Sequence, residues 1–276
     1  MSEAKRHGRL DKASSRADSA RQRVQRSFFA EVFHRLSTLD FMNQALLLAA
    51  VMVLWLFPNL IFLGAVTGRS LTENIERHMG LNSDASQSVE ELFRTSSTST
   101  GLTVGGVVFL VGAILATVAV IQNLWQKVFD VEGPGGWSEF WRQLVFGAAA
   151  LGGSTAVSLV THELNNVSPA LAAVVNFILL FVFFWLGMHL LLAGRVSLRD
   201  LVPSALITTA FFLGLGAFSA YFLSDAIVAN DKQFGPIGVV FILMTWLLAL
   251  GVVFILGPVV GVVWQDRRKA RRRAAA

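Results

Sequence analysis

The chain contains no cysteine, and charged residues make up only 15% of its 276 positions while hydrophobic residues make up 54%. The absence of cysteine excludes disulfides, thiolate metal ligands and cysteine nucleophiles. The shortage of charge is equally informative, because soluble domains carry about 25% charged residues. This composition indicates a chain that is surrounded mainly by lipid and whose fold depends on packing.

Recognisable catalytic patterns are also missing. The five histidines form neither HxH nor HExxH and have no adjacent acidic ligands. The net charge of +5 is concentrated in two tails, so it does not describe a nucleic-acid-binding surface. We therefore expect no metal, no cofactor, no nucleic-acid partner and no enzymatic activity. No cleavable signal peptide is expected either, because the first apolar run begins some forty residues into the sequence.

Six apolar runs lie between Phe41 and Trp264, and each approaches the ~20 residues that cross a bilayer. They predict an all-α fold, a polytopic membrane helix bundle. The predicted transmembrane helices cover residues 42–66, 102–124, 143–161, 169–193, 201–224 and 236–264. A disordered basic tail is expected over residues 1–26, the membrane domain over 27–266 and a second basic tail over 267–276.

The distribution of positive charge predicts the orientation of these spans. If both tails are cytoplasmic, the outer segments hold only four of the 23 Lys and Arg residues: Arg69, Arg77, Arg94 and Lys232. Cytoplasmic segments of membrane proteins are enriched in Lys and Arg. We therefore expect an even number of crossings in the plasma (inner) membrane, with both termini in the cytoplasm and anionic lipids beside the tails.

Three segments outside the spans have a recognisable pattern. Apolar residues at helical spacing between Val24 and Leu39 predict an N-terminal amphipathic helix lying in the membrane interface. The long outer loop from Thr67 to Gly101 predicts two short helices resting on the membrane surface. Before the sixth span, Gly235 and Pro236 predict a sharp turn into the first helical residue.

Few polar residues lie within the apolar runs. Candidate pathway positions are Asn59, Gln122, Asn123 and Asn176. The simpler readings are a structural kink at Asn59, an interfacial position for Gln122 and Asn123, and helix-helix hydrogen bonding for Asn176. Two prolines predict helix breaks, Pro58 and Pro258, each of which frees a backbone carbonyl or merely kinks its helix. No Asp, Glu, Lys or Arg falls in the middle of a span, which disfavours a carrier of the carboxylate type.

Small residues recur at spacings that allow close helix packing. Gly257 and Gly261 form a GxxxG pair, Gly112 and Ala116 a related pair, and residues 147–154 are nearly all small. Such residues let helix backbones approach one another in a membrane. We expect each of these segments to pack closely against a neighbouring helix.

An ordered series of short motifs resembles the YihY/BrkB family of membrane proteins over residues 28–266. The series consists of Leu56-Phe57-Pro58, Gln122-Asn123-Leu124-Trp125, Arg195-Val196-Ser197-Leu198-Arg199-Asp200, Ala205, Phe218, Tyr221, Phe234-Gly235-Pro236-Ile237-Gly238, Trp246 and Leu256-Gly257. The resemblance implies six spans with cytoplasmic ends and adds Arg195 and Tyr221 to the candidate pathway. The family usually has Asn where this chain has Gln122, and Ala-Glu where it has Pro258-Val259.

Two functions remain open on the sequence. One is a transporter or lipid-handling protein of unknown substrate, favoured by the packed spans, the prolines and the intramembrane polar groups. The other is a non-transporting envelope scaffold or integrity factor that acts through protein or lipid contacts, favoured by the lack of a charged intramembrane site. A homo-oligomer is compatible with both functions.

Overall fold

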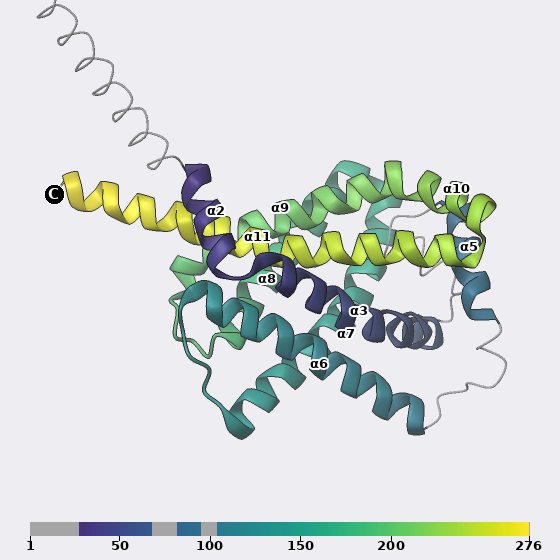
Figure 1. Ribbon diagram of the computed structural model, residues 1–276, viewed down its shortest axis with the longest axis horizontal. Coiled ribbons are helices and arrows are strands. Elements are labelled where there is room, and N and C mark those ends of the chain that lie inside the picture. Colours follow the sequence, from purple (N-terminus) through teal and green to yellow (C-terminus); the bar gives the residue numbers. More distant parts are fainter. Residues whose placement is uncertain (1–27, 68–81, 95–103, 276) are drawn as a thin grey trace, which may run out of the picture.

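A computed structural model describes residues 28–67, 82–94 and 104–275, and these ranges contain helices and no strand (Figure 1). The all-α prediction is confirmed, and a helix covers each of the six predicted apolar runs. In chain order the helices are α2 (Phe28–Thr38), α3 (Phe41–Thr67), α5 (Ser83–Arg94), α6 (Val104–Phe129), α7 (Gly136–Val167), α8 (Pro169–Leu191), α9 (Leu198–Phe218), the π-helical turn η2 (Ser219–Leu223), α10 (Ser224–Phe234) and α11 (Pro236–Ala275).

The number of membrane crossings is a separate question from the number of helices. In the part of the chain that the structure describes, four helical segments are long and apolar enough to cross a membrane. A fifth is obtained if α2 and α3, which are bent by 62° relative to each other, count as one span. The apolar helices support an integral membrane protein, and the count of six crossings remains a prediction.

Two helices extend beyond the predicted spans. α7 begins at Gly136 rather than at residue 143, and its first turns hold the stacked rings of Trp137 and Phe140. α11 continues to Ala275, so the described part of the second basic tail is helical. Arginine, lysine and alanine are strong helix formers, which favours this continuation. The first basic tail lies outside the described residues.

The bundle has two distinct ends, which lie at opposite sides of Figure 1. One end holds α2, the α6–α7 and α8–α9 loops and the last turns of α11, and we call it the basic end. Polar contacts join these segments, among them Arg35 to Asp266 at 2.6 Å, Lys269 to Asp200 at 3.0 Å and Arg195 to the Gly133 carbonyl. The opposite end holds α5 and α10, and we call it the far end.

The turn into α11 has the predicted chemistry. Gly235 alone separates α10 from α11, and its backbone has a φ of 62°, which a side chain would strain. Pro236 is the first residue of α11, where its missing N–H removes no helical hydrogen bond. The added Cβ of any residue at Gly238 would lie 2.5 Å from the Asn230 carbonyl oxygen, so α10 and α11 pack backbone to backbone here.

Two short helices outside the spans pack on the bundle. α5 is one of the two helices predicted in the outer loop, and its Ala85 and Val89 are buried while the Asn82 backbone amide donates to Ser224 Oγ. Its position on the membrane surface stays a prediction. The other predicted outer-loop helix lies outside the described residues. α2 is helical as predicted, but Val32 is buried against the bundle, so its position in the membrane interface stays a prediction.

Candidate functional site

The structure distributes the predicted polar positions over several surfaces instead of gathering them. Gln122 is fully buried in α6, whereas its neighbour Asn123 is exposed. Asn176 is half-buried on α8, Arg195 is exposed in the α8–α9 loop, and Tyr221 is 77% exposed in η2. The role of these five side chains in a pathway stays a prediction. The side chain of Asn59 lies outside the described part of the structure.

Gln122 holds the carboxyl-terminal end of α8. Its amide Nε2 donates to the Leu191 carbonyl at 3.0 Å, and its Oε1 accepts from Gln143 Nε2 at 2.9 Å. The last carbonyls of a helix have no partner within the helix. Gln122 therefore joins α6 and α7 to the end of α8, and because it is fully buried it is not the interfacial residue that was the simpler reading of the sequence.

Arg142 reinforces the same junction from α7. Its guanidinium Nη1 donates to the Leu190 carbonyl at 3.0 Å. Two side chains that the sequence analysis did not single out, Arg142 and Gln143, thus complete the cap of α8. They lie about twenty residues from Gln122 along the chain, and no local pattern connects them. Only the bundle brings them to the same place.

Pro258 does not break its helix, because α11 continues through it to Ala275. Proline lacks the N–H that would bond to the carbonyl four residues earlier, so the Phe254 carbonyl loses its helical partner. The indole Nε1 of the buried Trp125 donates to that carbonyl at 3.2 Å. The freed carbonyl is therefore used to join α6 to α11. α3 is likewise helical through Pro58, whose side chain lies outside the described part.

The GxxxG pair forms the predicted close contact. An added Cβ at Gly261 would lie 2.3 Å from Ser204 Cα, and one at Gly257 would lie 2.7 Å from Thr208 Cα. Ser204 Oγ also donates to the Pro258 carbonyl at 3.3 Å. α9 and α11 are thus held together backbone against backbone, which small residues permit.

The other small-residue segments give a mixed result. In the run 147–154, an added Cβ at Gly147 would lie 2.3 Å from Ile114 Cγ2, so close packing is confirmed at this end of the run. An added Cβ at Gly152 or Gly153, by contrast, would meet nothing within 4 Å. The prediction is wrong at Gly112 and Ala116, which are exposed, and an added Cβ at Gly112 would meet nothing within 4 Å. At these two positions α6 does not pack against another described helix.

Aromatic rings fill the centre of the bundle. Trp125 contacts Phe146 and stacks on Phe254, and Phe184 meets both Phe212 and Phe254, with ring centroids 5.6 to 6.4 Å apart. The rings come from α6, α7, α8, α9 and α11, and Trp125 and Phe184 are almost completely buried. From this layer to the basic end the described bundle is tightly closed.

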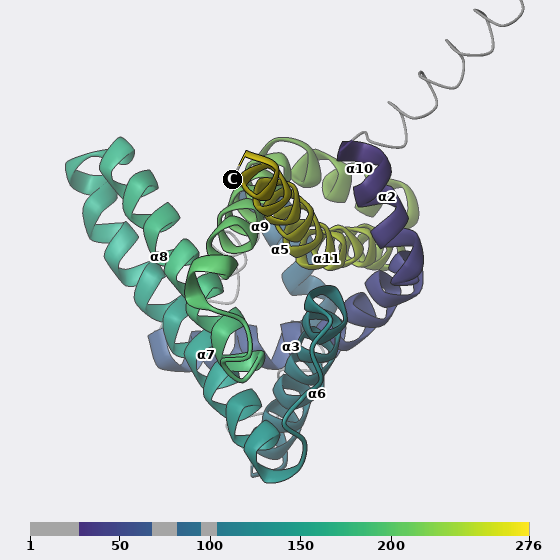
Figure 2. The same cartoon turned by 90° about the vertical axis from the view of Figure 1, so that its left-hand side faces the viewer.

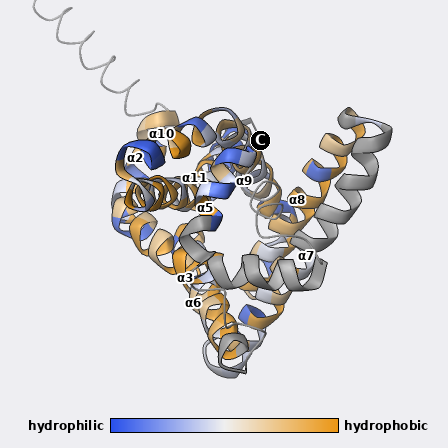
Figure 3. Ribbon diagram, turned by 90° about the vertical axis from the view of Figure 1, so that its right-hand side faces the viewer, coloured by the Kyte–Doolittle hydropathy of each residue, from blue (hydrophilic) through white to orange (hydrophobic). Residues whose placement is uncertain are grey.

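Beyond the aromatic layer, the side chains of α8 and α9 are half-buried or exposed, although Leu180, Phe181 and Leu215 still pack against the core. No residue of α8 from Ala173 to Phe183 is buried, and none of α9 from Ala210 to Phe218 is buried. These two stretches are the halves of α8 and α9 that lie away from the loop joining them. Figures 2 and 3 show the beginning of α8 standing apart from α10 and α11. The half of the bundle nearer the far end therefore presents open apolar surface on α8 and α9.

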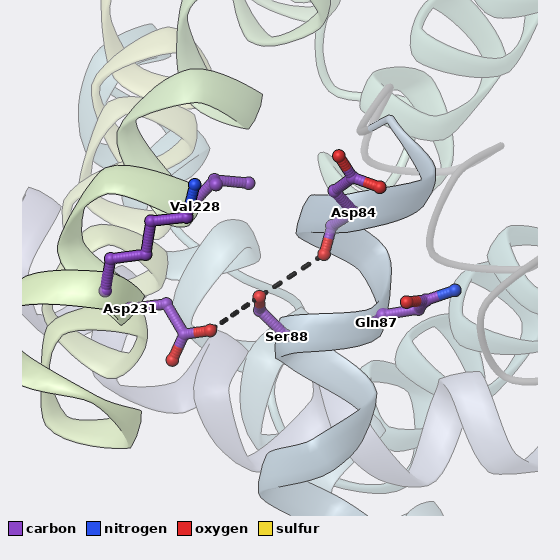
Figure 4. A pocket seen from close by; sticks show the side chains of 6 residues that line it. Asp84, Gln87, Ser88, Val228 and Asp231 are labelled. Carbon is purple, nitrogen blue, oxygen red and sulfur yellow. Dashed lines mark hydrogen bonds between the residues drawn. The ribbon is translucent and has the colours of Figure 1, made fainter.

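A small polar pocket of about 250 Å³ lies at the far end between α5 and α10 (Figure 4). Ser88 is at its centre, donating to Asp231 Oδ2 at 2.8 Å and lying 3.3 Å from the Asp84 carbonyl. Gln87 and Lys232 also line it. Because Ser88 and Asp231 are hydrogen-bonded to each other, the side chains of this pocket hold α5 against α10.

Comparison with known proteins agrees with the motif series. The family described as Virulence factor BrkB matches residues 32–276 of the chain. No curated protein and no solved structure matches it. The match covers every described helix from α3 onward and most of α2, so it includes the α8 cap, the α9–α11 contact and the aromatic layer. The chain therefore belongs to the BrkB family, and its apolar helices make it an integral membrane protein.

Proposed function

We propose that this BrkB-family protein crosses the plasma (inner) membrane six times, with both termini in the cytoplasm, and moves or presents a lipid-like amphipathic molecule. The observation that carries the proposal is the contrast between the two halves of the bundle. The half toward the basic end is closed by the aromatic layer and the α8 cap, while α8 and α9 expose apolar surface in the other half. This is an arrangement that admits a ligand from the side, through the outer leaflet.

The chemistry of the exposed surface supports an apolar chain as the part of the ligand that enters. Neither α8 from Pro169 to Leu191 nor α9 from Leu201 to Phe218 contains Asp, Glu, Lys or Arg. Asn176 on α8 and the hydroxyl of Tyr221 in η2 are the polar groups nearest the open half. An ion or a strongly polar solute would be left without partners here, whereas an acyl chain would not.

The basic end supports the orientation. Among the described residues, most of the Lys and Arg side chains lie at this end, including Arg142, Arg195 and the arginines after Trp264 in α11. Positive charge is enriched on the cytoplasmic side of membrane proteins. With this end in the cytoplasm, the exposed apolar surface of α8 and α9 lies in the outer leaflet, and the short loops after α6 and α8 lie beside anionic lipid headgroups.

A lipid-movement assay tests the proposal. The full chain is reconstituted into liposomes that contain trace amounts of a phospholipid with a fluorescent nitrobenzoxadiazole (NBD) group, and dithionite then destroys the dye in the outer leaflet. Protein that moves lipid between leaflets exposes additional dye, so the remaining fluorescence falls below that of empty liposomes. A panel of zwitterionic and anionic headgroups identifies the preferred class.

Two tryptophan substitutions locate the route. An added Cβ at Gly214 or Gly216 of α9 meets nothing within 4 Å, so Gly214→Trp and Gly216→Trp occupy open space without disturbing the packed half. These positions point to different sides of α9, and at least one should slow the movement. Gly112→Trp on α6 is the matched control, because that site is equally open. If no lipid of the panel moves, the scaffold function replaces this proposal.

A further inference from the structure

α2 has three distinct faces. With about 3.6 residues per turn, positions spaced by four and three share a face. The first face holds Phe28, Glu31, Val32 and Arg35, and it packs on the last turns of α11: Arg267 pairs with Glu31 at 2.8 Å and its guanidinium lies 5.5 Å from the Phe28 ring centroid. This face fixes the rotation of α2 about its own axis.

The two remaining faces differ sharply in polarity. Phe29, Phe33 and Leu36 form an apolar flank, on which Phe29 is 80% and Phe33 74% exposed. The third face holds Ala30, His34 and Ser37. The side chains of His34 and Ser37 are polar and exposed. A helix with an apolar flank beside a polar face is typical of a membrane-water interface. Because the first face is occupied by α11, the apolar flank is the surface left for lipid.

The position of α2 in the chain brings this flank to a membrane surface. Only Leu39 and Asp40 separate α2 from α3, and the two helices meet at an angle of 62°. Eleven residues of helix span about 16 Å. With α3 as one of the proposed spans, every residue of α2 lies within a short distance of the place where the bilayer surface begins.

A positive stripe lies on the last turns of α11, on a side of that helix that faces neither α2 nor α9. Asp266 and Arg267 face α2, while Gln265 and Lys269 bond to Asp200 at the start of α9. The exposed side chains Arg268, Arg271 and Arg272 share a third side of α11. The exposed Trp264 marks the preceding turn, and tryptophan is enriched at the headgroup level of membranes.

We infer that the apolar flank of α2 and the arginine stripe of α11 form one binding surface for phospholipids with anionic headgroups. Phe29 and Phe33 enter the acyl boundary, and the arginines contact phosphate oxygens, which the guanidinium group recognises well. A lipid surface fits better than an acidic protein, because only two residues separate the helix that carries these phenylalanines from α3, which is one of the proposed spans. The inference does not depend on lipid movement between leaflets.

The natural absence of cysteine makes a direct depth measurement possible. Single cysteines replace Phe29 or Phe33 on the apolar flank and His34 or Ser37 on the polar face, and each full-length variant carries an NBD dye. The proteins are placed in nanodiscs that contain lipids with a nitroxide quencher in the acyl chain. We expect strong quenching and a blue-shifted emission at positions 29 and 33, with little change at 34 and 37. Equal quenching at all four positions, or none at 29 and 33, overturns the inference.

A charge substitution tests the headgroup preference. Quenching at position 33 is compared in nanodiscs of phosphatidylcholine with and without phosphatidylglycerol, and we expect a severalfold increase with the anionic lipid. Arg268→Gln, Arg271→Gln and Arg272→Gln together should abolish that increase, whereas Lys232→Gln at the far end should retain it. An increase that survives the triple substitution overturns the role of the stripe. The melting temperature of each variant verifies that the fold is intact, since all these side chains are exposed.

Discussion

Replacing Trp125 by phenylalanine tests whether the freed Phe254 carbonyl joins α6 to α11. Trp125→Phe retains an aromatic ring that can stack on Phe254 but removes the indole N–H, whose donor atom lies 3.2 Å from the carbonyl oxygen. Pro258 prevents α11 from supplying a donor of its own. The carbonyl is therefore left buried without a partner, and we expect the bundle to become less stable.

The size of the effect follows from the buried carbonyl. Leaving a buried acceptor unsatisfied costs about 1–3 kcal/mol, and measured side-chain hydrogen bonds between membrane helices reach about 1.7 kcal/mol. We expect the hydrogen bond to account for about 1–2 kcal/mol of the loss, and the smaller ring adds a cavity term. Pro258→Ala restores an N–H at position 258 that can bond to the Phe254 carbonyl. In that background Trp125→Phe should lose only the cavity term.

A double-mutant cycle measures this coupling. Unfolding of the four variants in mixed micelles is followed by circular dichroism, which does not depend on the removed tryptophan. The cavity term is common to both backgrounds and cancels, so the coupling energy reports the hydrogen bond. Trp246→Phe is the control, since its indole donates to Ser219 Oγ and should show no coupling to Pro258. An equal cost of Trp125→Phe with proline and with alanine at position 258 would refute the reasoning.

Three further predictions address packing, the α8 cap and orientation. Gly257→Leu or Gly261→Leu should lower the melting temperature in detergent, because a side chain there collides with Thr208 or Ser204 and overpacking costs about 1–3 kcal/mol, while Gly112→Leu should leave it unchanged. Gln122→Leu should destabilise by about 1–3 kcal/mol, because both the Leu191 carbonyl and the Gln143 amide lose a partner, whereas the exposed Asn123→Leu should not. Reporter domains fused before Met1 and after Ala276 should remain cytoplasmic and one inserted near Ser97 should be outside; export of the carboxyl-terminal reporter contradicts an even number of crossings.

The features that could be predicted from the sequence are those with a local cause. Apolar runs of membrane length predicted the helices, the family motifs predicted the family, and the turn at Gly235 and Pro236 follows from the backbone preferences of two neighbouring residues. The small residues Gly257 and Gly261 predicted a contact, although their partners on α9 could not be named. In each of these cases the physical reason lies within a few residues of the feature.

The site predictions were weaker because polarity does not specify a partner. Gln122 was identified as a polar residue in a span, but its role depends on Leu191 and Gln143, which only the folded bundle brings together. Pro258 was expected to interrupt α11, and the interruption did not occur because Trp125 of another helix supplies the missing donor. The apolar spacing of α5 predicted a helix, but such spacing cannot distinguish lipid from a neighbouring helix.

Hydrogen bonds between helices contribute to the packing of the half of the bundle toward the basic end. Trp125 to the Phe254 carbonyl, Gln122 to the Leu191 carbonyl and Ser204 to the Pro258 carbonyl all join different helices on the basic side of the aromatic layer or within it. Such bonds are directional, and in a membrane the hydrophobic effect does not drive helices together. Apart from Asn176, α8 from Ala173 to Phe183 and α9 from Ala210 to Phe218 present apolar side chains and glycines, for which contact with lipid is nearly as favourable as contact with protein. Under the proposed function, this apolar surface is the part of the bundle that receives lipid from one leaflet.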